Sequence, residues 1–460
     1  MENFWEYNVW GFFNLLAVLL ASLLAGNMIR RRVPGMKESL IPTSVLGGGI
    51  LIVVAGIYKF FTGEVMFDTA FFGYNGTANL ELLTYHALAL GFIASTFKPA
   101  KGKMTRQRTT EIFNTGVTTV STYLLQAILG MAISMIAVLV IKDFFPAAGL
   151  LLPFGYGQGT GQAMNYGTIY ETDFGFAGGK SFGLTIAALG FLSASIGGVI
   201  HLNILKRRGV ITKKASAEGA IRSEQIQSAD EIPMQESMDK LTVQMALISL
   251  AYLLAYLMMF GLGKLLPGMK SVIFGFNFLL GVLAATLVKA VLNLLRRKDL
   301  IHREYTNFFL MTRVSNFFFD LMVVAGIAAI RLDILENYWG IILIMGVVGM
   351  ISTYAYNYFI AGKLFPAYRE EQFLTMYGML TGTASTGVIL LREIDGNFET
   401  PASDNMVYQN FPAIVFGFPI MLLATFAPKE PGLTMVLLIG FFIVMNVILF
   451  RSFLFKKKKK

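Results

Sequence analysis

Two stretches rich in glycine and threonine, Gly155–Gln162 (GYGQGTGQ) and Gly378–Gly387 (GMLTGTASTG), decide how this sequence folds. Each interrupts a long apolar segment, and one lies in each half of the chain. Glycine allows a helix to break and lets the backbone approach a ligand closely. Irregular backbone at membrane depth is tolerated only where protein or a water-filled cavity surrounds it. We call the stretches the first and second tracts, and we expect each to break a helix inside a membrane.

The composition indicates a membrane protein. Of 460 residues, 55% are apolar and 14% are charged, whereas soluble domains carry about 25% charged residues. We therefore predict an all-α polytopic membrane protein. The net charge of +10 lies in short basic blocks between apolar segments, so it indicates topology and not a nucleic-acid surface. The absence of cysteine excludes disulfides and cysteine-based metal sites.

Apolar segments long enough to cross a bilayer recur along the chain. A crossing helix needs about 20 predominantly apolar residues. Eleven spans are predicted, at Asn8–Ile29, Leu40–Tyr58, Leu80–Phe97, Ile112–Ile141, Ser181–Leu205, Leu241–Gly261, Val272–Leu295, Leu310–Ile330, Trp339–Ala361, Val407–Phe426 and Thr434–Phe455.

Basic residues predict the orientation of these spans. The main blocks would all lie on one side of the bilayer, namely Arg30–Lys37, Lys98–Arg108, Lys206–Lys214, Arg296–Arg303, Lys363–Arg369 and Lys456–Lys460. Loops rich in lysine and arginine are cytoplasmic. We expect an outside N-terminus and a cytoplasmic C-terminus.

A polar linker at 206–240 separates two similar halves. Residues 1–205 and 241–430 each hold five spans and one tract, and residues 431–460 add a further helix and a basic tail. The first span of each half would run in the opposite direction, which predicts two inverted five-helix repeats. The tract-bearing segments 147–171 and 370–395 would be re-entrant hairpins, because both ends of each must lie on one side. The linker itself is predicted to be a mobile tether.

The motifs GQGTGQA at 157–163 and GTASTG at 382–387 resemble those of the bacterial sodium/glutamate symporter (ESS) family. The similarity extends over almost the whole chain in its arrangement of spans, hairpins and central loop. The related 2-hydroxycarboxylate transporters share this plan. Two features depart from the family pattern. In the first tract, Gln158 separates Gly157 from the Gly159-Thr160 pair, and the histidine that the family usually carries there is absent. In addition, an eleventh span follows the second repeat.

The tracts are the candidate substrate site. A helix that begins after a break presents free N–H groups and a positive dipole end, which suit a carboxylate. Arg392 could neutralise a carboxylate or contact Asp395. In the alternative interpretation, the small residues only allow the hairpins to pack against other helices. Besides Arg392, the predicted substrate-binding residues are Gly159, Thr160, Gly161, Gln162, Asn165, Thr383, Ala384, Ser385 and Thr386.

Ionisable groups inside spans are costly, so each is a candidate for function. Asp320 could coordinate Na⁺ together with Asn316 and Thr381, could pair with Arg313, or could carry a proton. His86 occupies the matching position in the first half. A lone histidine in a span is more often a hydrogen-bonded packing residue.

The resemblance implies a homodimeric secondary transporter of a bacterial inner membrane that takes up glutamate with Na⁺ by alternating access. A citrate- or malate-type carrier is the alternative within transport, and a channel is the alternative from another class. An enzyme is disfavoured because no nucleophile–base pair or metal-ligand cluster is evident and the chain has only three histidines. No nucleic-acid partner is expected.

Overall fold

The computed structural model describes residues 3–36, 38–98, 105–210, 231–234, 237–396 and 399–454. In this part of the chain the regular structure is helical, apart from one isolated bridge between Glu231 and Glu304. Ten of its helices are long and apolar enough to cross a membrane, or eleven if one bent pair is counted as a span. The prediction of an all-α, multi-pass membrane architecture is confirmed at this level.

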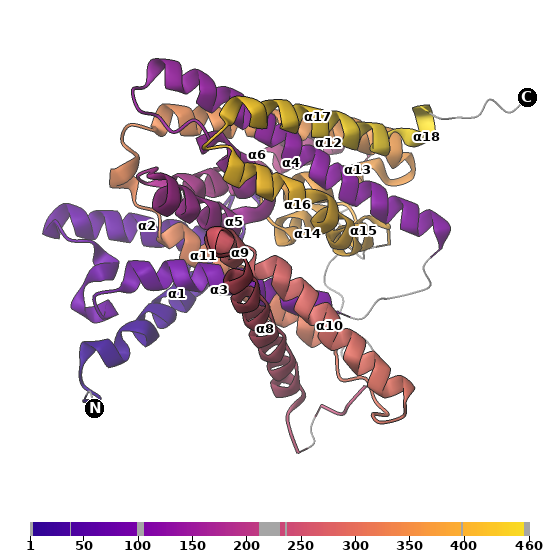
Figure 1. Cartoon of the computed structure of the whole chain (residues 1–460), viewed down its shortest axis with the longest axis horizontal. Coiled ribbons are helices and arrows are strands. Elements are labelled where there is room, and N and C mark those ends of the chain that lie inside the picture. Colours follow the sequence, from indigo (N-terminus) through magenta and orange to yellow (C-terminus); the bar gives the residue numbers. More distant parts are fainter. Residues whose placement is uncertain are drawn as a thin grey trace, which may run out of the picture.

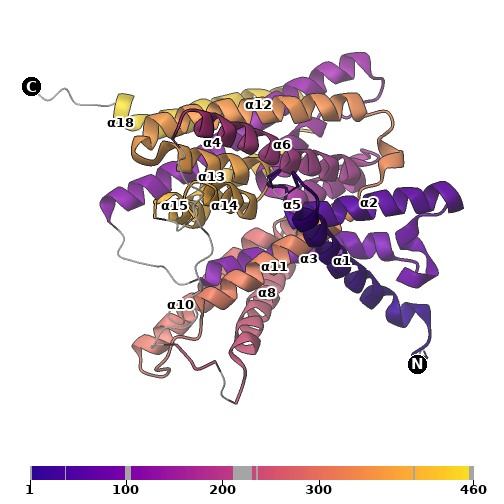
Figure 2. The ribbon, with the colours of Figure 1, turned by 180° about the vertical axis from the view of Figure 1, so that it is seen from behind.

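The helices form two packed groups (Figures 1 and 2). In the lower group of Figure 1, α3 packs against α10 and α11, α2 packs against α1 and α11, and α8 packs against α10. This group consists of α1 (Tyr7–Arg32), α2 (Thr43–Thr62), α3 (Gly76–Phe97), α8 (Lys240–Leu265), α10 (Asn277–Arg297) and α11 (Phe308–Ala328).

The upper group is assembled around α4 and α12. Helix α4 packs against α12, α16 and α17, and α5 packs along α6. Each half of the chain thus places its first three spans in the lower group and its later helices in the upper group. The upper group consists of α4 (Arg106–Val140), α5 (Leu151–Phe174), α6 (Gly179–Arg207), α12 (Trp339–Leu364), α13 (Arg369–Thr381), α14 (Ala384–Arg392), α15 (Ala402–Tyr408), α16 (Asn410–Phe426) and α17 (Pro431–Leu449).

Short elements connect the long helices. They are η1 (Met66–Asp68), η2 (Ala70–Phe72), η3 (Ala148–Leu150), η4 (Pro267–Met269), α9 (Lys270–Gly275), η5 (Leu332–Leu335), η6 (Pro366–Tyr368) and α18 (Arg451–Leu454).

Glycine lets the helices of the upper group approach at backbone distance. A Cβ atom added to Gly183 of α6 would lie 2.5 Å from the carbonyl oxygen of Ala163 in α5. One added to Gly155 of α5 would lie 2.8 Å from the backbone nitrogen of Ala187 in α6. Small residues at helix interfaces have this role in membrane proteins, where lipid offers no hydrophobic drive between helices.

Two predicted spans contain breaks that the sequence interpretation missed. The span predicted at Val272–Leu295 begins as the short helix α9, and the helix restarts at Asn277 after Phe276. The side-chain amide of Asn277 donates to the carbonyl oxygen of Tyr85 at 2.8 Å, a contact made by tertiary packing. The span predicted at Val407–Phe426 consists mainly of α16, and near its start at Gln409 the chain bends by 50° from the preceding α15.

The end of the central linker packs against the lower group. Glu231 and Lys240 form an ion pair at 2.7 Å with both side chains buried. The side-chain amide of Asn307 donates to the same Glu231 carboxylate. The predictions of a mobile tether at residues 211–230 and of a basic tail at Lys456–Lys460 lie outside the described residues.

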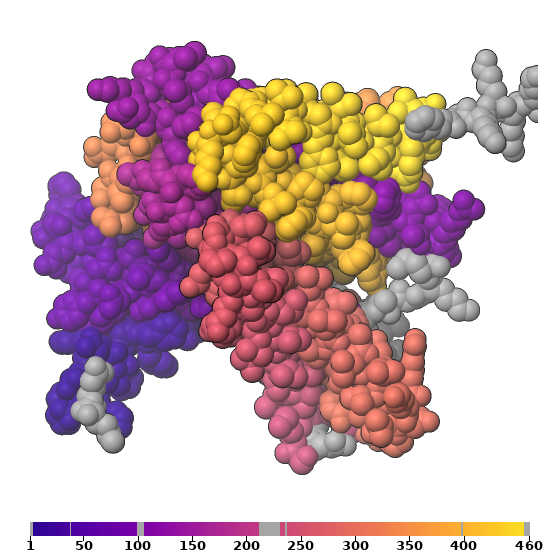
Figure 3. Space-filling view, viewed as in Figure 1, coloured from indigo at the N-terminus to yellow at the C-terminus, as the bar shows by residue number. Residues whose placement is uncertain are grey.

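The extra C-terminal helix belongs to the upper group. Helices α16 and α17 cover the face of this group that is turned to the viewer in the space-filling view (Figure 3). Tyr356 of α12 donates its hydroxyl to Asn446 of α17 at 2.8 Å. Arg451 donates to the side-chain oxygen of Asn114 on α4 at 3.0 Å. These hydrogen bonds join α17 to α12 and the following α18 to α4.

Candidate functional site

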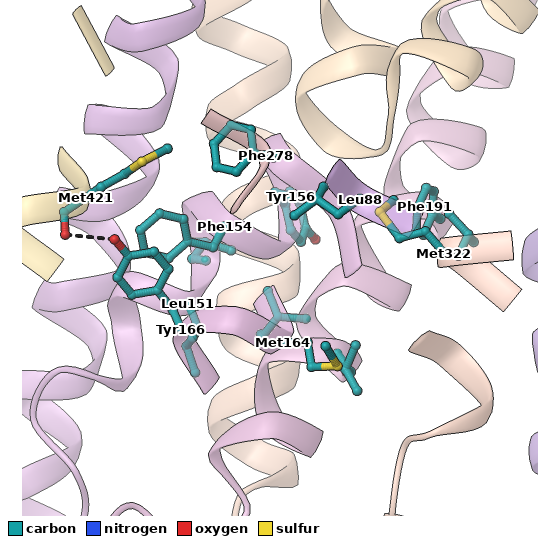
Figure 4. Close-up of a cluster of buried hydrophobic side chains, with 14 of the residues drawn as sticks. Leu88, Leu151, Phe154, Tyr156, Met164, Tyr166, Phe191, Phe278, Met322 and Met421 are labelled. Atoms are coloured by element: carbon teal, nitrogen blue, oxygen red, sulfur yellow. Dashed lines mark hydrogen bonds between the residues drawn. The ribbon is translucent and has the colours of Figure 1, made fainter. Parts of the chain in front are cut away.

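The first tract breaks α5 at Gly159, which has φ 77° and ψ −170° inside an otherwise helical segment. The two parts of α5 lie against each other. The rings of Phe154 and Tyr166 stack with centroids 3.9 Å apart and an interplanar angle of 3°, as Figure 4 shows. A continuous helix would separate residues twelve positions apart by about 18 Å. The chain therefore reverses direction at Gly159.

The second tract breaks the chain between α13 and α14. Gly382 (φ −145°, ψ −108°) and Thr383 (φ −138°, ψ 171°) are both non-helical. A Cβ atom on Gly378 would lie 2.8 Å from the Cα atom of Gly387. These glycines are nine positions apart, which corresponds to about 14 Å in a continuous helix. The chain thus reverses direction here as well.

The two breaks face each other. A Cβ atom built on Gly159 would lie 3.4 Å from the methyl carbon of Thr383 and 3.7 Å from the carbonyl oxygen of Gly382. The tracts are more than 200 positions apart in the sequence. Tertiary packing has therefore brought the two sequence-predicted tracts into one place.

A cavity of about 120 Å³ lies at this meeting point, between the upper and lower groups. The lower group contributes apolar residues from α3, α10 and α11, and the upper group contributes both tracts together with α4 and α16. Figure 4 shows Leu88 and Met322 beside each other next to α5. The lining residues are Leu88, Phe92, Ser95, Tyr123, Gly157, Gln158, Gln162, Phe278, Phe319, Met322, Met379, Gly382, Thr383, Ala384, Gln409, Asn410, Ala413, Ile414, Gly417 and Met421.

Amides and hydroxyls provide the polar part of the lining. Among the described residues, no Lys, Arg, Asp, Glu or His contributes to it. Gln162 is 1% exposed, and its Nε2 atom has no hydrogen-bond partner. Helix α14 begins at Ala384 on the cavity wall, so its first N–H groups are available there. The site thus offers hydrogen-bond donors without a fixed positive charge.

The remaining predicted residues of the first tract have supporting contacts. Thr160 is fully buried, and its hydroxyl donates to the carbonyl oxygen of Met322 at 3.2 Å, so it does not face the cavity. The Asn165 amide donates to Gln162 Oε1 at 2.7 Å and to the carbonyl oxygen of Gly275 at 3.1 Å. Asn165 therefore fixes the orientation of the Gln162 side chain.

In the second tract, Thr383 and Ala384 line the cavity. The hydroxyls of Thr383 and Thr386 lie 3.4 Å apart, and Ser385 is partly exposed beside them. Arg392 lies at the other end of α14, where the like charge of Arg313 of α11 repels its guanidinium. The Asp395 carboxylate accepts backbone hydrogen bonds from Glu399 and Thr400 in its own loop.

Among the described residues, no hydrogen bond joins the three sodium candidates to one another. Asp320 interacts with the Ser44 hydroxyl of α2, while Asn316 is exposed. The Thr381 hydroxyl donates to the carbonyl oxygen of Tyr377 in its own helix. Within the described part of the chain, no group of three acidic or histidine residues could hold a metal ion.

The other two ionisable candidates have local partners. Arg313 lies over the Phe309 ring, with its guanidinium carbon 4.9 Å from the ring centroid. His86 is hydrogen-bonded to the Tyr252 hydroxyl at 2.6 Å. His86 thus has the contacts of a packing residue that joins α3 to α8.

The sequence interpretation missed Gln409, Asn410 and Tyr123 as parts of the site. Gln409 and Asn410 lie at the bend between α15 and α16. Two adjacent amides followed by Pro412 inside an apolar segment are a signal that could have indicated this bend. Tyr123 donates its hydroxyl to the carbonyl oxygen of Gly157 at 3.0 Å, which only the fold reveals.

No protein-family model matches this chain, and no curated protein matches it significantly.

Proposed function

We propose that the protein is a secondary active transporter that takes up glutamate together with Na⁺ by alternating access. The observation that carries this proposal is the meeting of two broken helix pairs, one from each half, at a cavity between two helix groups. Paired discontinuous helices at corresponding places in two halves mark the substrate site in transporters built from repeats. Membership of the ESS family, with its homodimeric assembly, belongs to the same proposal.

The proposed architecture is a pair of inverted repeats with re-entrant hairpins. In support, both halves distribute their helices in the same order, three to the lower group and the rest to the upper group. In both halves the tract-bearing segment reverses direction at its break. With the basic loops placed in the cytoplasm, the first hairpin enters from outside and the second from inside.

The chemistry of the cavity suits a small carboxylate. Its volume of about 120 Å³ is well below the 300–1,000 Å³ of pockets for drug-sized ligands. The N-terminal end of α14 offers N–H groups and a positive dipole end to an anion. Gln162 adds a buried donor that has no partner among the described residues.

In this proposal the structure corresponds to a state open toward the cytoplasm. Gly161 beside the first break packs against Leu88 and Met322. From that level the cavity continues to Ser95 near the predicted cytoplasmic end of α3 and to Phe319, about one turn before Met322 in α11. Both residues are displaced from Leu88 and Met322 in the predicted cytoplasmic direction. Polar contacts on the other side join the two groups: Lys180 pairs with Glu81 at 2.9 Å, and the Arg331 backbone donates to Ser181 at 3.1 Å.

The charge balance predicts that uptake depends on membrane potential. Glutamate carries one net negative charge, so a single Na⁺ per substrate would make transport electroneutral. The potential supplies about 2.3 kcal/mol per charge per 100 mV. At least two cations must accompany each glutamate if the protein is to use this energy.

Uptake into proteoliposomes tests the proposal. We expect an inward Na⁺ gradient to drive saturable accumulation of labelled L-glutamate, and an inside-negative potential to increase it. Competition by D-glutamate, citrate and malate distinguishes an amino-acid carrier from a 2-hydroxycarboxylate carrier. Flux that neither saturates nor responds to a second solute would indicate a channel and contradict the proposal.

A further inference from the structure

The interface between α4 and α12 contains a buried polar ladder outside the cavity. Thr122 and Gln126 lie one turn apart on α4, and Thr353 and Asn357 lie one turn apart on α12, with all four side chains at most 1% exposed. Gln126 Nε2 donates to Thr353 Oγ1 at 2.8 Å. Asn357 Nδ2 approaches Thr122 Oγ1 at 3.3 Å and donates to the Thr353 carbonyl oxygen at 2.9 Å. Both amides therefore lie around Thr353.

These bonds use the amide nitrogens and leave the amide oxygens without partners. Gln126 Oε1 and Asn357 Oδ1 are both buried, and neither has a hydrogen-bond partner. Gln126 Nε2 also donates to the carbonyl oxygen of Leu380 at 3.0 Å. Since carbonyl oxygens only accept, exchanging oxygen and nitrogen in either amide would place two acceptors against each other. The unpartnered atoms are therefore oxygens.

Buried oxygens without partners are costly. Each buried acceptor without a partner costs about 1–3 kcal/mol, so the two oxygens call for an electron-poor occupant. A hard monovalent cation accepts neutral amide and hydroxyl oxygens as ligands, whereas divalent ions favour carboxylates. The four ladder residues include no carboxylate.

The ladder is connected to the second tract. The Leu380 carbonyl oxygen, which accepts a hydrogen bond from Gln126, lies next to Thr381, the last residue of α13. Thr383 and Ala384, directly beyond the break, line the cavity. An ion that fixes the Gln126 amide would therefore fix the backbone that presents the N-terminus of α14 to the substrate.

We propose that Gln126 and Asn357 form a Na⁺ site between α4 and α12 that couples the ion to the second tract. The identity of the ion rests on the proposed function, but the site itself does not require that the substrate be glutamate. The site differs from the region around Asp320, which lies in the lower group beside α2.

The test is thermal unfolding of the purified full-length protein across a NaCl titration, with choline chloride holding the ionic strength constant. We expect Na⁺ to raise the unfolding midpoint of the wild type with a saturable dependence. The substitutions Gln126→Met and Asn357→Leu remove one oxygen each and should shift the half-saturating Na⁺ concentration upward by at least tenfold. Asn357→Asp keeps an oxygen and adds a charge, so it should retain the response even if an apolar variant fails to fold.

Gln244→Met is the matched control, because Gln244 is a fully buried amide in the lower group whose nitrogen and oxygen both have partners. It should keep the wild-type Na⁺ dependence. A wild type indifferent to Na⁺, or Gln126→Met and Asn357→Leu variants with the wild-type dependence, would show that the oxygens hold only water and would overturn the site. If Na⁺ stabilisation is lost in these variants while the wild type takes up no glutamate, the site stands and the transport proposal fails.

Discussion

Gly159 occupies a backbone region that is essentially restricted to glycine, with φ 77° and ψ −170°. Its nearest neighbours across the break belong to Gly382 and Thr383 of the second tract. The local backbone conformation thus depends on the absence of a side chain, whereas a Cβ atom would make only ordinary van der Waals contacts with the second tract. Adding a single methyl group at Gly159 is therefore expected to change both uptake and the free energy of unfolding.

We predict that Gly159→Ala abolishes uptake and lowers the free energy of unfolding by about 1–3 kcal/mol, the usual cost of such a backbone conformation. Uptake in proteoliposomes and thermal unfolding measure the two effects. Gly440→Ala in α17 is the control, because nothing lies within 4 Å of a Cβ atom there. Wild-type uptake by the Gly159→Ala variant would exclude the first break from the site.

Gln162 offers a second test at the residue scale, because its Nε2 atom is buried on the cavity wall without a partner. A hydrogen bond to a charged group contributes about 1.5–3 kcal/mol, and 1.4 kcal/mol is a factor of ten. Gln162→Met should therefore raise the KM for glutamate by about tenfold or more. Gln244→Met again provides the comparison, and an unchanged KM would remove Gln162 from the substrate site.

Thr160 and Thr383 differ although both belong to the predicted tracts. Thr383 lines the cavity, while the Thr160 hydroxyl joins α5 to α11 through Met322. We expect Thr383→Ala to raise the KM for glutamate. Thr160→Ala should instead change the maximal rate, since it loosens a contact between the two helix groups. Measuring the KM and the maximal rate of uptake for each variant separates the two effects. A raised KM in Thr160→Ala together with a changed maximal rate in Thr383→Ala would reverse these roles.

Among the helical elements, the tight reversal between α13 and α14 depends on glycine contacts along their length. A Cβ atom on Gly387 would lie 2.5 Å from the carbonyl oxygen of Thr375. The glycine and threonine content of the tracts predicted where the chain would break. It could not predict the break at Phe276, which is accompanied by a contact with a residue distant in sequence, Tyr85. The bend at Gln409 lies outside both tracts, and its local signal is the pair of amides followed by Pro412.

We predict that Gly387→Ala separates α13 from α14 and lowers the free energy of unfolding by about 1–3 kcal/mol, as overpacking does in well-packed interiors. Uptake should fall at the same time, because the start of α14 would move away from the cavity. Gly340→Ala at the start of α12, where a Cβ atom meets nothing within 4 Å, should leave both quantities unchanged. An equally stable Gly387→Ala variant would contradict the tight contact.

At the scale of the whole molecule, alternating access requires the upper and lower groups to move relative to each other. Lys180 of α6 pairs with Glu81 of α3 at 2.9 Å and lies 3.9 Å from Glu171 of α5. Because Glu81 belongs to the lower group and Glu171 to the upper group, movement between the groups would break the first contact and keep the second.

The chain contains no cysteine, so introduced thiols can be cross-linked selectively. We predict that a short bifunctional maleimide joining Glu81→Cys to Lys180→Cys stops uptake by holding the groups together on this side. Each single variant treated in the same way should retain its uptake. Undiminished transport by the fully cross-linked protein would contradict the movement proposed here.

The sequence by itself determined the helical, membrane-spanning class and the positions of the two tract breaks, because span length, hydropathy and glycine content act locally along the chain. Only the tertiary structure decided that the breaks meet, that Gln409 and Asn410 join them, and that Thr160 turns away from the cavity. These outcomes depend on which helices pack side by side. Contacts between residues far apart in sequence set that packing, and no local pattern encodes it.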